Sequence, residues 1–289
     1  MRIAIIGCNY QGLVTATGLA ENGHQVSAYD PDGDKLAALR AGDSPVHEPG
    51  LEELIASNME EERLSFTGDL NEAIAGTLMV FFCVAPEPDS TGGLDMAPLF
   101  DAVRAMAPTF DGYRIVVLRS LCPPGTGEAV ADTLRRAGAR DFDVVVNPDF
   151  LRQGRAIEDF MRPSRVIIGC DDVRVREIMK ELFSPFLRTG QPFVALGMRT
   201  AELSRYATSA LLAVRISMMN QLAGLCAAYG ADVSELREGL SADERIGGKY
   251  LFPGIGYGGT GLVEDVRMLR QLAHEQGVAA DLIDAVHSV

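Results

Sequence analysis

A glycine-rich turn near the amino terminus carries the first residues that could bind a ligand. It follows a short apolar segment, residues 2–6, and precedes apolar positions at helical spacing over residues 13–21. Strand, glycine turn and helix in this order form the dinucleotide-binding fingerprint, in which the amino end of the helix faces a pyrophosphate. The predicted cofactor residues of the turn are Gly7, Asn9, Tyr10, Gln11 and Gly12.

A carboxylate follows the second predicted strand. Residues 25–29 have the pattern of a buried strand, and Asp30 stands directly after them. At this place a carboxylate bonds the ribose hydroxyls of an adenosine and repels a 2′-phosphate. We therefore expect the cofactor to be NAD rather than NADP.

Asn9 departs from the fingerprint, because a glycine normally lets the backbone approach the phosphates at this position. Asparagine tolerates unusual backbone angles and its amide could donate to a phosphate, but its Cβ takes up room. Two interpretations stay open. The turn either binds NAD, which we favour, or keeps the fold without holding a dinucleotide.

Further apolar segments continue this pattern through the first half of the chain. Residues 79–84, 114–118, 143–146 and 165–169 each predict a strand, the last of which is expected to close this half. Helical segments alternate with them, which predicts an α/β fold with a Rossmann-like, doubly wound and mostly parallel sheet. Ligands of such sheets bind at the carboxyl ends of the strands.

Residues 199–230 predict one long helix, because apolar side chains continue there without a proline. Most of this helix is apolar all round, so it needs neighbours on every side. We expect it to pair with its copy in a homodimer; a long core helix of a monomer is the alternative. Polar side chains interrupt the apolar run and argue against a membrane span: Arg205, Arg215, Asn220 and Gln221.

Two domains follow from these segments. Residues 1–198 are expected to form the NAD-binding domain, and residues 199–289 the long connecting helix with a small all-helical dimerisation domain. The boundary lies where strand-and-helix alternation gives way to helical spacing alone.

Composition excludes several kinds of partner. The formal net charge of -14 argues against a nucleic-acid partner and against an anionic membrane surface. The five cysteines lack metal-ligand spacing, and Cys83 and Cys170 close apolar runs in which thiols are expected to be buried. No signal peptide precedes the first strand. We expect a cytoplasmic protein without a bound metal.

Six short motifs, spread over nearly the whole chain, carry a family resemblance. They are Gly7-x-x-Tyr10-x-Gly12, Asp30-x-Asp32-x-x-Lys35, Glu48-Pro49-Gly50-Leu51, Asn147-Pro148-x-Phe150-Leu151-Arg152-x-Gly154, Asp243-x-Arg245-Ile246-Gly247 and Pro253-Gly254-x-Gly256-Tyr257-Gly258-Gly259. In type and order they resemble the UDP-glucose and GDP-mannose 6-dehydrogenase family.

The resemblance implies a four-electron oxidation of a sugar C6 alcohol to a carboxylate, with two NAD and a thioester on a cysteine. That route needs a thiolate, which holds the aldehyde covalently while the second hydride leaves. In this chain Gly261 occupies the position of the nucleophile, and Glu264 that of a following lysine. We therefore expect the thioester route to be lost.

The resemblance also implies catalytic roles. Asp265 matches a carboxylate that works with a bound water as base, although a carboxylate facing its own helix dipole is an equal alternative. Arg205 replaces a lysine that positions an oxyanion or water, and Ser209 replaces an asparagine. Asp149 replaces a glutamate.

Further cofactor and substrate residues follow from the same resemblance. The added cofactor positions are Lys35, Val84, Pro86 and Ser120. The substrate positions are Phe150, Leu151, Arg245, Lys249, Tyr250, Tyr257 and Gly258. Solvated surface charge is the alternative for the two cations among them.

Two functions remain in view. Family members continue into a third, UDP-binding domain, which we expect this chain to lack because it ends at Val289. The favoured function is an NAD-dependent two-electron oxidation of an alcohol on a small molecule such as a nucleotide sugar. The alternative is a non-catalytic, dimeric binding or regulatory partner in a biosynthetic pathway.

Overall fold

The computed structural model describes residues 1–84, 86–88, 93–187 and 190–289. The chain divides into two compact units, one of Met1–Glu87 with Leu94–Leu203 and one of Pro88–Gly93 with Ser204–Val289. The boundary expected from the sequence, between residues 198 and 199, stays a prediction.

The first unit is built around an eight-stranded sheet with the order β10-β9-β8-β7-β4-β1-β2-β3. Every neighbouring pair in it is parallel except β8 with β9, which is antiparallel. The strand order runs outward from β1 in both directions, so a topological switch point lies between β1 and β4. The strands are β1 (Arg2–Ile6), β2 (Gln25–Tyr29), β3 (Leu64–Thr67), β4 (Met79–Phe82), β7 (Arg114–Leu118), β8 (Phe142–Val146), β9 (Val166–Gly169) and β10 (Phe193–Leu196).

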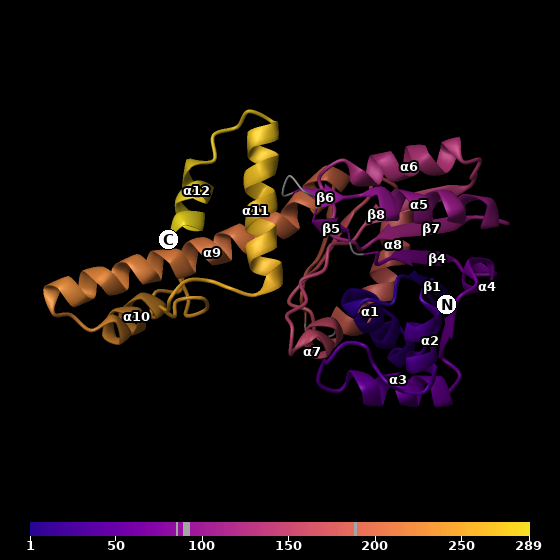
Figure 1. Ribbon diagram of the computed structural model, residues 1–289, viewed down its shortest axis with the longest axis horizontal. Helices are drawn as coiled ribbons and strands as arrows, with labels where there is room; N and C mark the ends of the chain where they lie inside the picture. Colours follow the sequence, from indigo (N-terminus) through magenta and orange to yellow (C-terminus); the bar gives the residue numbers. More distant parts are fainter. Residues whose placement is uncertain (85, 89–92, 188–189) are drawn as a thin grey trace. The chain divides into compact units, whose positions relative to one another are not determined.

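Helices cover both faces of this sheet. Because successive side chains of a strand point to opposite faces, Ile3 and Ile5 pack on one side while Ala4 and Ile6 pack on the other. Figure 1 shows α5 and α6 on one face, and α1 and α3 on the other. The helices are α1 (Tyr10–Glu21), α2 (Gly33–Arg40), α3 (Leu51–Glu60), α4 (Leu70–Ile74), α5 (Ala97–Met106), α6 (Thr126–Arg136), α7 (Ala156–Met161) and α8 (Val173–Phe183).

The predicted fold class is confirmed, but the prediction of the last strand is wrong. Residues 165–169 do not close the sheet, because β10 follows β9 along the chain and pairs with it. All residues of β10 are at least partly exposed, as expected at the edge of a sheet. The short elements outside the sheet are β5 (Glu87–Pro88), β6 (Leu94–Asp95), η1 (Ala107–Thr109) and η2 (Ser184–Leu187).

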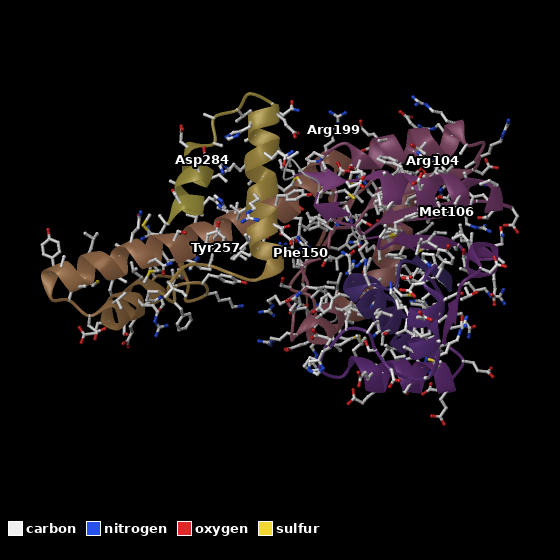
Figure 2. The ribbon with its side chains drawn as sticks, viewed as in Figure 1. Arg104, Met106, Phe150, Arg199, Tyr257 and Asp284 are labelled. Carbon is white, nitrogen blue, oxygen red and sulfur yellow. The ribbon has the colours of Figure 1, made fainter. Side chains whose placement is uncertain are left out.

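The second unit is helical. It contains most of α9 (Met198–Tyr229), together with α10 (Val233–Ser241), α11 (Thr260–Glu275) and α12 (Asp281–Ser288). Ala213, Val266 and Val286 form its buried apolar cluster. Arg270 of α11 forms an ion pair with Asp284 of α12, which Figure 2 labels.

Much of the apolar surface of α9 is exposed in the single chain. Leu211, Met218 and Leu225 are 66%, 53% and 55% exposed, so the expectation of cover on every side is not met within one copy. By length and composition alone, α9 would be able to cross a membrane, and the expectation that it does not stays a prediction. A single helix of this kind does not by itself indicate a membrane protein.

Candidate active site

The glycine turn has the geometry that the fingerprint requires. Gly7 has a φ of +102°, and a Cβ there would lie 2.9 Å from the carbonyl oxygen of Cys83. A Cβ on Gly12 would lie 1.8 Å from the carbonyl oxygen of Gly7. Both positions therefore exclude any side chain, which leaves the turn closely packed against the end of β4.

Asn9 is the N-cap of α1. Its Oδ1 accepts from the backbone N–H of Gly12 at 2.9 Å, and its Nδ2 donates to the carbonyl oxygen of Cys83. One N–H of the Asn9 carboxamide is therefore engaged within the turn. Asn9 stabilises the start of the helix and ties it to β4.

Asp30 lies at the carboxyl end of β2 and is 5% exposed. Its Oδ2 accepts from the N–H of Cys8 at 2.8 Å and from Nζ of Lys35 at 2.9 Å, while Oδ1 accepts from the N–H of Asp32 at 3.1 Å. These donors hold the carboxylate beside the glycine turn, where a ribose would be bound.

The residues present fit a dinucleotide. Tyr10 and Gln11 are the first two residues of α1, and no acceptor within the described chain takes their backbone N–H groups. Free N–H groups at a helix amino end bind phosphate. Together with Asp30 they provide one contact for a pyrophosphate and one for a ribose.

The loops after β4, β7 and β8 bring several predicted residues together. Ser120 donates from its N–H, at 2.9 Å, and from Oγ, at 3.2 Å, to the carbonyl oxygen of Phe82. Asp149 is 8% exposed, and Nε2 of Gln11 lies 2.7 Å from its Oδ1. Val84 and Pro86, which follow β4, are half-buried.

Phe150 and Leu151 follow Asp149 in the loop after β8. The guanidinium of Arg165 lies 3.8 Å from the centroid of the Phe150 ring. Leu151 is partly buried against the apolar core. Their predicted contact with substrate stays a prediction.

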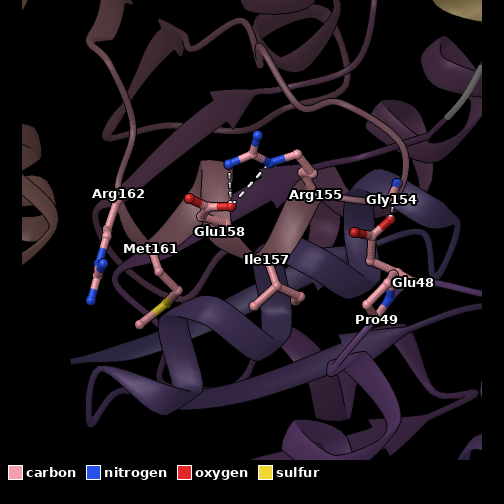
Figure 3. Close-up of a pocket in the computed structure, with 8 residues that line it drawn as sticks. All are labelled: Glu48, Pro49, Gly154, Arg155, Ile157, Glu158, Met161 and Arg162. Atoms are coloured by element: carbon pink, nitrogen blue, oxygen red, sulfur yellow. Dashed lines mark hydrogen bonds and ion pairs between the residues drawn. The ribbon is translucent and has the colours of Figure 1, made fainter.

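Glu48 joins the loop before α3 to the loop before α7. It is 4% exposed and accepts from the hydroxyl of Tyr10 at 2.7 Å and from the N–H groups of Gly154 and Ala156 at 2.8 and 2.7 Å. Burial and the bond to Glu48 raise the pKa of Tyr10. An adjoining hollow of about 350 Å³ is lined in part by Arg155 and Glu158. Figure 3 marks the ion pair between these two side chains.

In the second unit, Asp265 stands at the centre of a polar cluster. It is 1% exposed, and its Oδ2 accepts from Nε of Arg205 at 3.0 Å and from Oγ of Ser209 at 2.5 Å. Its Oδ1 is buried without a hydrogen-bond partner among the described residues. Asp265 is the sixth residue of α11, so the alternative of a first-turn carboxylate facing the helix dipole is wrong.

Gly261 lies beside this cluster. A Cβ built on Gly261 would be 3.7 Å from Nη2 of Arg205. Gly261 is therefore next to the guanidinium of Arg205. No side chain at Gly261 can attack a carbonyl.

The loop between α10 and α11 holds the remaining predicted substrate residues. Arg245 is exposed and forms an ion pair with Asp243 at 2.6 Å, and Lys249 is also exposed. Both cations therefore agree with the alternative that they are solvated surface charges. Tyr250 has a φ of +59°, a conformation unusual for a large side chain. The Tyr257 hydroxyl is buried without a partner in the described part of the chain, and Gly258 is exposed.

α9 anchors this loop through polar side chains that the sequence did not single out for that role. Arg215 donates to the carbonyl oxygens of Ile246 and Gly247 at 2.9 and 2.8 Å. Oδ1 of Asn220 accepts from the N–H of Gly254 at 2.8 Å. The polar interruptions of the apolar helix therefore serve the fold of the second unit.

All five cysteines are free and buried. Burial raises the pKa of both Cys8 and Cys83 to about 12, and that of Cys122 well above its usual range. Thiols with such pKa values stay protonated near neutral pH and are inert. The described residues also contain no group of three or more His, Cys, Asp or Glu side chains that could hold a metal ion.

Comparison with known proteins decides the family. Residues 1–187 match the NAD binding domain of the UDP-glucose/GDP-mannose dehydrogenase family, and residues 199–289 match its central domain. The chain belongs to the UDP-glucose/GDP-mannose dehydrogenase family. The expected resemblance and the expected cofactor, NAD, are confirmed.

Curated relatives match the whole chain. It is 39% identical to a UDP-glucose 6-dehydrogenase of Pseudomonas aeruginosa and 40% identical to one of Rhizobium meliloti, over 100% of this chain in both cases. It covers 65% of the first relative and 67% of the second. The chain thus spans about two thirds of the length of these dehydrogenases.

Solved structures of the family have the same fold. A UDP-glucose dehydrogenase from Pyrobaculum islandicum superposes with a TM-score of 0.93 at 33% identity, covering 99% of this chain and 66% of that one. A GDP-mannose dehydrogenase from Pseudomonas aeruginosa gives a TM-score of 0.80 at 28% identity, covering 99% and 67%.

Proposed function

We propose that this chain is an NAD-dependent dehydrogenase that oxidises an alcohol by two electrons and has lost the covalent route to an acid. The observation that carries the proposal is the cluster of Arg205, Asp265 and Ser209 beside Gly261. It keeps a buried carboxylate and a cation but offers no thiol. A small molecule is the proposed substrate, and a nucleotide sugar is the first class to test, because the relatives are named for one.

In the first unit, Asp30 and the amino end of α1 would hold NAD, the cofactor that supplies a hydride acceptor when bound. In the second unit, Oδ1 of Asp265, which has no hydrogen-bond partner among the described residues, would accept the hydroxyl proton, directly or through water. The guanidinium of Arg205 stabilises the negative charge that develops on the oxygen. The C–H and O–H bonds break, and a carbonyl group forms.

Product analysis tests this function. The chain is incubated with NAD and a panel of nucleotide sugars, and NADH and sugar products are both quantified. We expect one NADH per sugar and an aldehyde that a hydrazine reagent traps. Two NADH per sugar with a uronate product would contradict the proposal.

A Gly261→Cys variant is the matched control for the missing thiol. We expect it to form no uronate, because Leu121 and Glu264 also depart from the family's pattern. Uronate formation by this single change would show that the thiol alone separates this chain from the family's reaction.

A non-catalytic function is the second candidate. It is favoured by the engagement of Asp265 Oδ2, which both Arg205 and Ser209 already contact. Such a protein would bind NAD without reducing it and act as a partner or regulator in a biosynthetic pathway. Saturable NAD binding without NADH formation on any sugar of the panel supports this candidate over the enzyme.

We also propose that the protein is a homodimer in the cytoplasm. Leu211, Met218 and Leu225 repeat every seven residues on α9 and are more than half exposed. This spacing places them along one side of a helix, where a second copy of α9 would cover them. The free thiols agree with a reducing compartment.

A further inference from the structure

The side chain of Gln11 leaves the cofactor turn and reaches two distant strand ends. Its Nε2 donates to the carbonyl oxygen of Arg119 and to Oδ1 of Asp149, each at 2.7 Å. A primary carboxamide has two N–H donors, so both are used. Arg119 follows β7 and Asp149 follows β8, which are two and three strands from β1 in the sheet.

These strand ends are also bonded to one another. The N–H groups of Arg119 and Ser120 both donate to the carbonyl oxygen of Phe82 at 2.9 Å. Nη1 of Arg119 donates to Oδ1 of Asn147 at 2.6 Å. The ends of β4, β7 and β8 therefore form one hydrogen-bonded edge, and Gln11 connects the cofactor turn to it.

The strand order separates the two halves of a dinucleotide. Asp30 follows β2, on one side of the switch point between β1 and β4, and marks the adenosine half. The ends of β4, β7 and β8 lie on the opposite side, which leaves them for the nicotinamide half. This step rests on the proposed NAD site.

We propose that Gln11 is a positioning residue that fixes the Asp149 carboxylate and the Arg119 turn against the start of α1 and so sets the nicotinamide half of the site. Asp149 is 8% exposed, so water replaces a lost donor poorly. In a Gln11→Val variant the side chain has no N–H donor, so neither of the two hydrogen bonds can form. Gln11 then acts on the nicotinamide end of NAD and leaves the adenosine end unchanged.

Calorimetric titration of the full chain with NAD and with ADP-ribose, which lacks nicotinamide, tests this assignment. We expect Gln11→Val to weaken NAD binding about 10-fold, because the variant loses a hydrogen bond to a charged group. The same change should weaken ADP-ribose binding less than about 2-fold. Gln25→Val, the same change at an exposed position of β2, serves as the control and should alter neither. Equal weakening of both ligands, or unchanged NAD binding, would overturn the assignment.

If the wild-type chain binds neither ligand, the proposed NAD-dependent function is wrong. A second measurement then still tests whether Gln11 holds Asp149. Thermal unfolding is compared for Gln11→Val, Asp149→Ala and the double variant. We expect the two losses in Tm not to add, because both changes remove the same bond. Additive losses would show that Gln11 does not hold Asp149.

Discussion

Asp265 is the most deeply buried charged residue of the polar cluster in the second unit. Asp265 is 1% exposed and shares a 3.0 Å ion pair with Arg205, which is 18% exposed at its side chain. An ion pair this far from water is costly to break from one side, because the remaining charge stays buried. The cluster therefore holds the unit together as well as presenting a carboxylate oxygen.

Replacing Asp265 by asparagine tests the stabilising role of this ion pair. We expect Asp265→Asn to lower the free energy of unfolding by about 3–5 kcal/mol, the cost of an unpaired buried charge. Urea denaturation measures it. Arg245→Gln, which breaks the exposed pair with Asp243, should cost less than about 1 kcal/mol. Similar losses of unfolding free energy for both variants would show that the Arg205–Asp265 pair does not stabilise the fold more than an exposed pair does.

The buried thiols make the fold sensitive to alkali. Burial raises the pKa of Cys8 and Cys83 from 9.0 to about 12, so the unfolded chain loses these protons first as pH rises. Their contribution to stability is full below pH 9 and is lost between pH 9 and about 12, by up to about 1.4 kcal/mol per pH unit for each thiol. Urea denaturation across this window should show a shallower decline for the Cys8→Ala, Cys83→Ala double variant. An equal decline would refute the assignment.

Single residues also mark the limit of sequence-based prediction. Gly7, Gly12 and Asp30 were predicted because their positions relative to strand and helix carry the signal. The bond between Gln11 and Asp149 joins residues 138 positions apart, and the one between Ser209 and Asp265 joins residues 56 apart. No local sequence pattern predicts such contacts, since they arise from the packing of whole helices and strands.

The start of α9 is fixed to the first unit by a helix cap. Glu202, which is 3% exposed, accepts from the N–H groups of Gly125 and Gly127 at 2.5 and 2.7 Å. These groups lie at the amino end of α6, where a carboxylate also meets a favourable helix dipole. One side chain thus joins two elements 75 residues apart.

Glu202→Ala tests this cap. We expect a loss of about 2–4 kcal/mol in the free energy of unfolding, because one buried and one partly buried N–H group lose their acceptor. Urea denaturation measures it, and Glu128→Ala, which removes a surface pair with Arg199, is the control with an expected loss below about 1 kcal/mol. A loss no larger for Glu202 than for Glu128 would rule out a stabilising cap.

Elements were predicted best where they are buried. The central strands β1, β4 and β7 were found from continuous apolar runs, and the long helix was placed within one residue at each end. β10 was missed because its four residues lie at an edge and lack the buried pattern. Position in the sheet, rather than composition, makes that segment a strand.

Considered as a whole, the protein has more apolar helix surface than one copy covers. In the most apolar 18-residue segment of α9, only 22% of the residues are buried. A protein with a net charge of -14 needs apolar rather than cationic contacts to associate with its own copy, since like charges repel. The apolar stripe formed by Leu211, Met218 and Leu225 of α9 is therefore where we expect two copies to pair.

Charge placed on this stripe should separate the copies. We expect the Leu211→Glu, Met218→Glu double variant to be a monomer by light scattering while the wild-type chain is a dimer. Val173→Glu alters an apolar residue of α8 that is 67% exposed, and it should leave the dimer intact. Unchanged mass for the α9 variant would place the interface elsewhere.

Calorimetric titration of the wild-type chain with NAD and NADP tests the central claim that this scaffold still holds its cofactor. We expect saturable binding of NAD, at least about 10-fold weaker binding of NADP, and weakened NAD binding in Asp30→Ala, which removes the ribose contact. The absence of NAD binding at millimolar concentration would contradict the account.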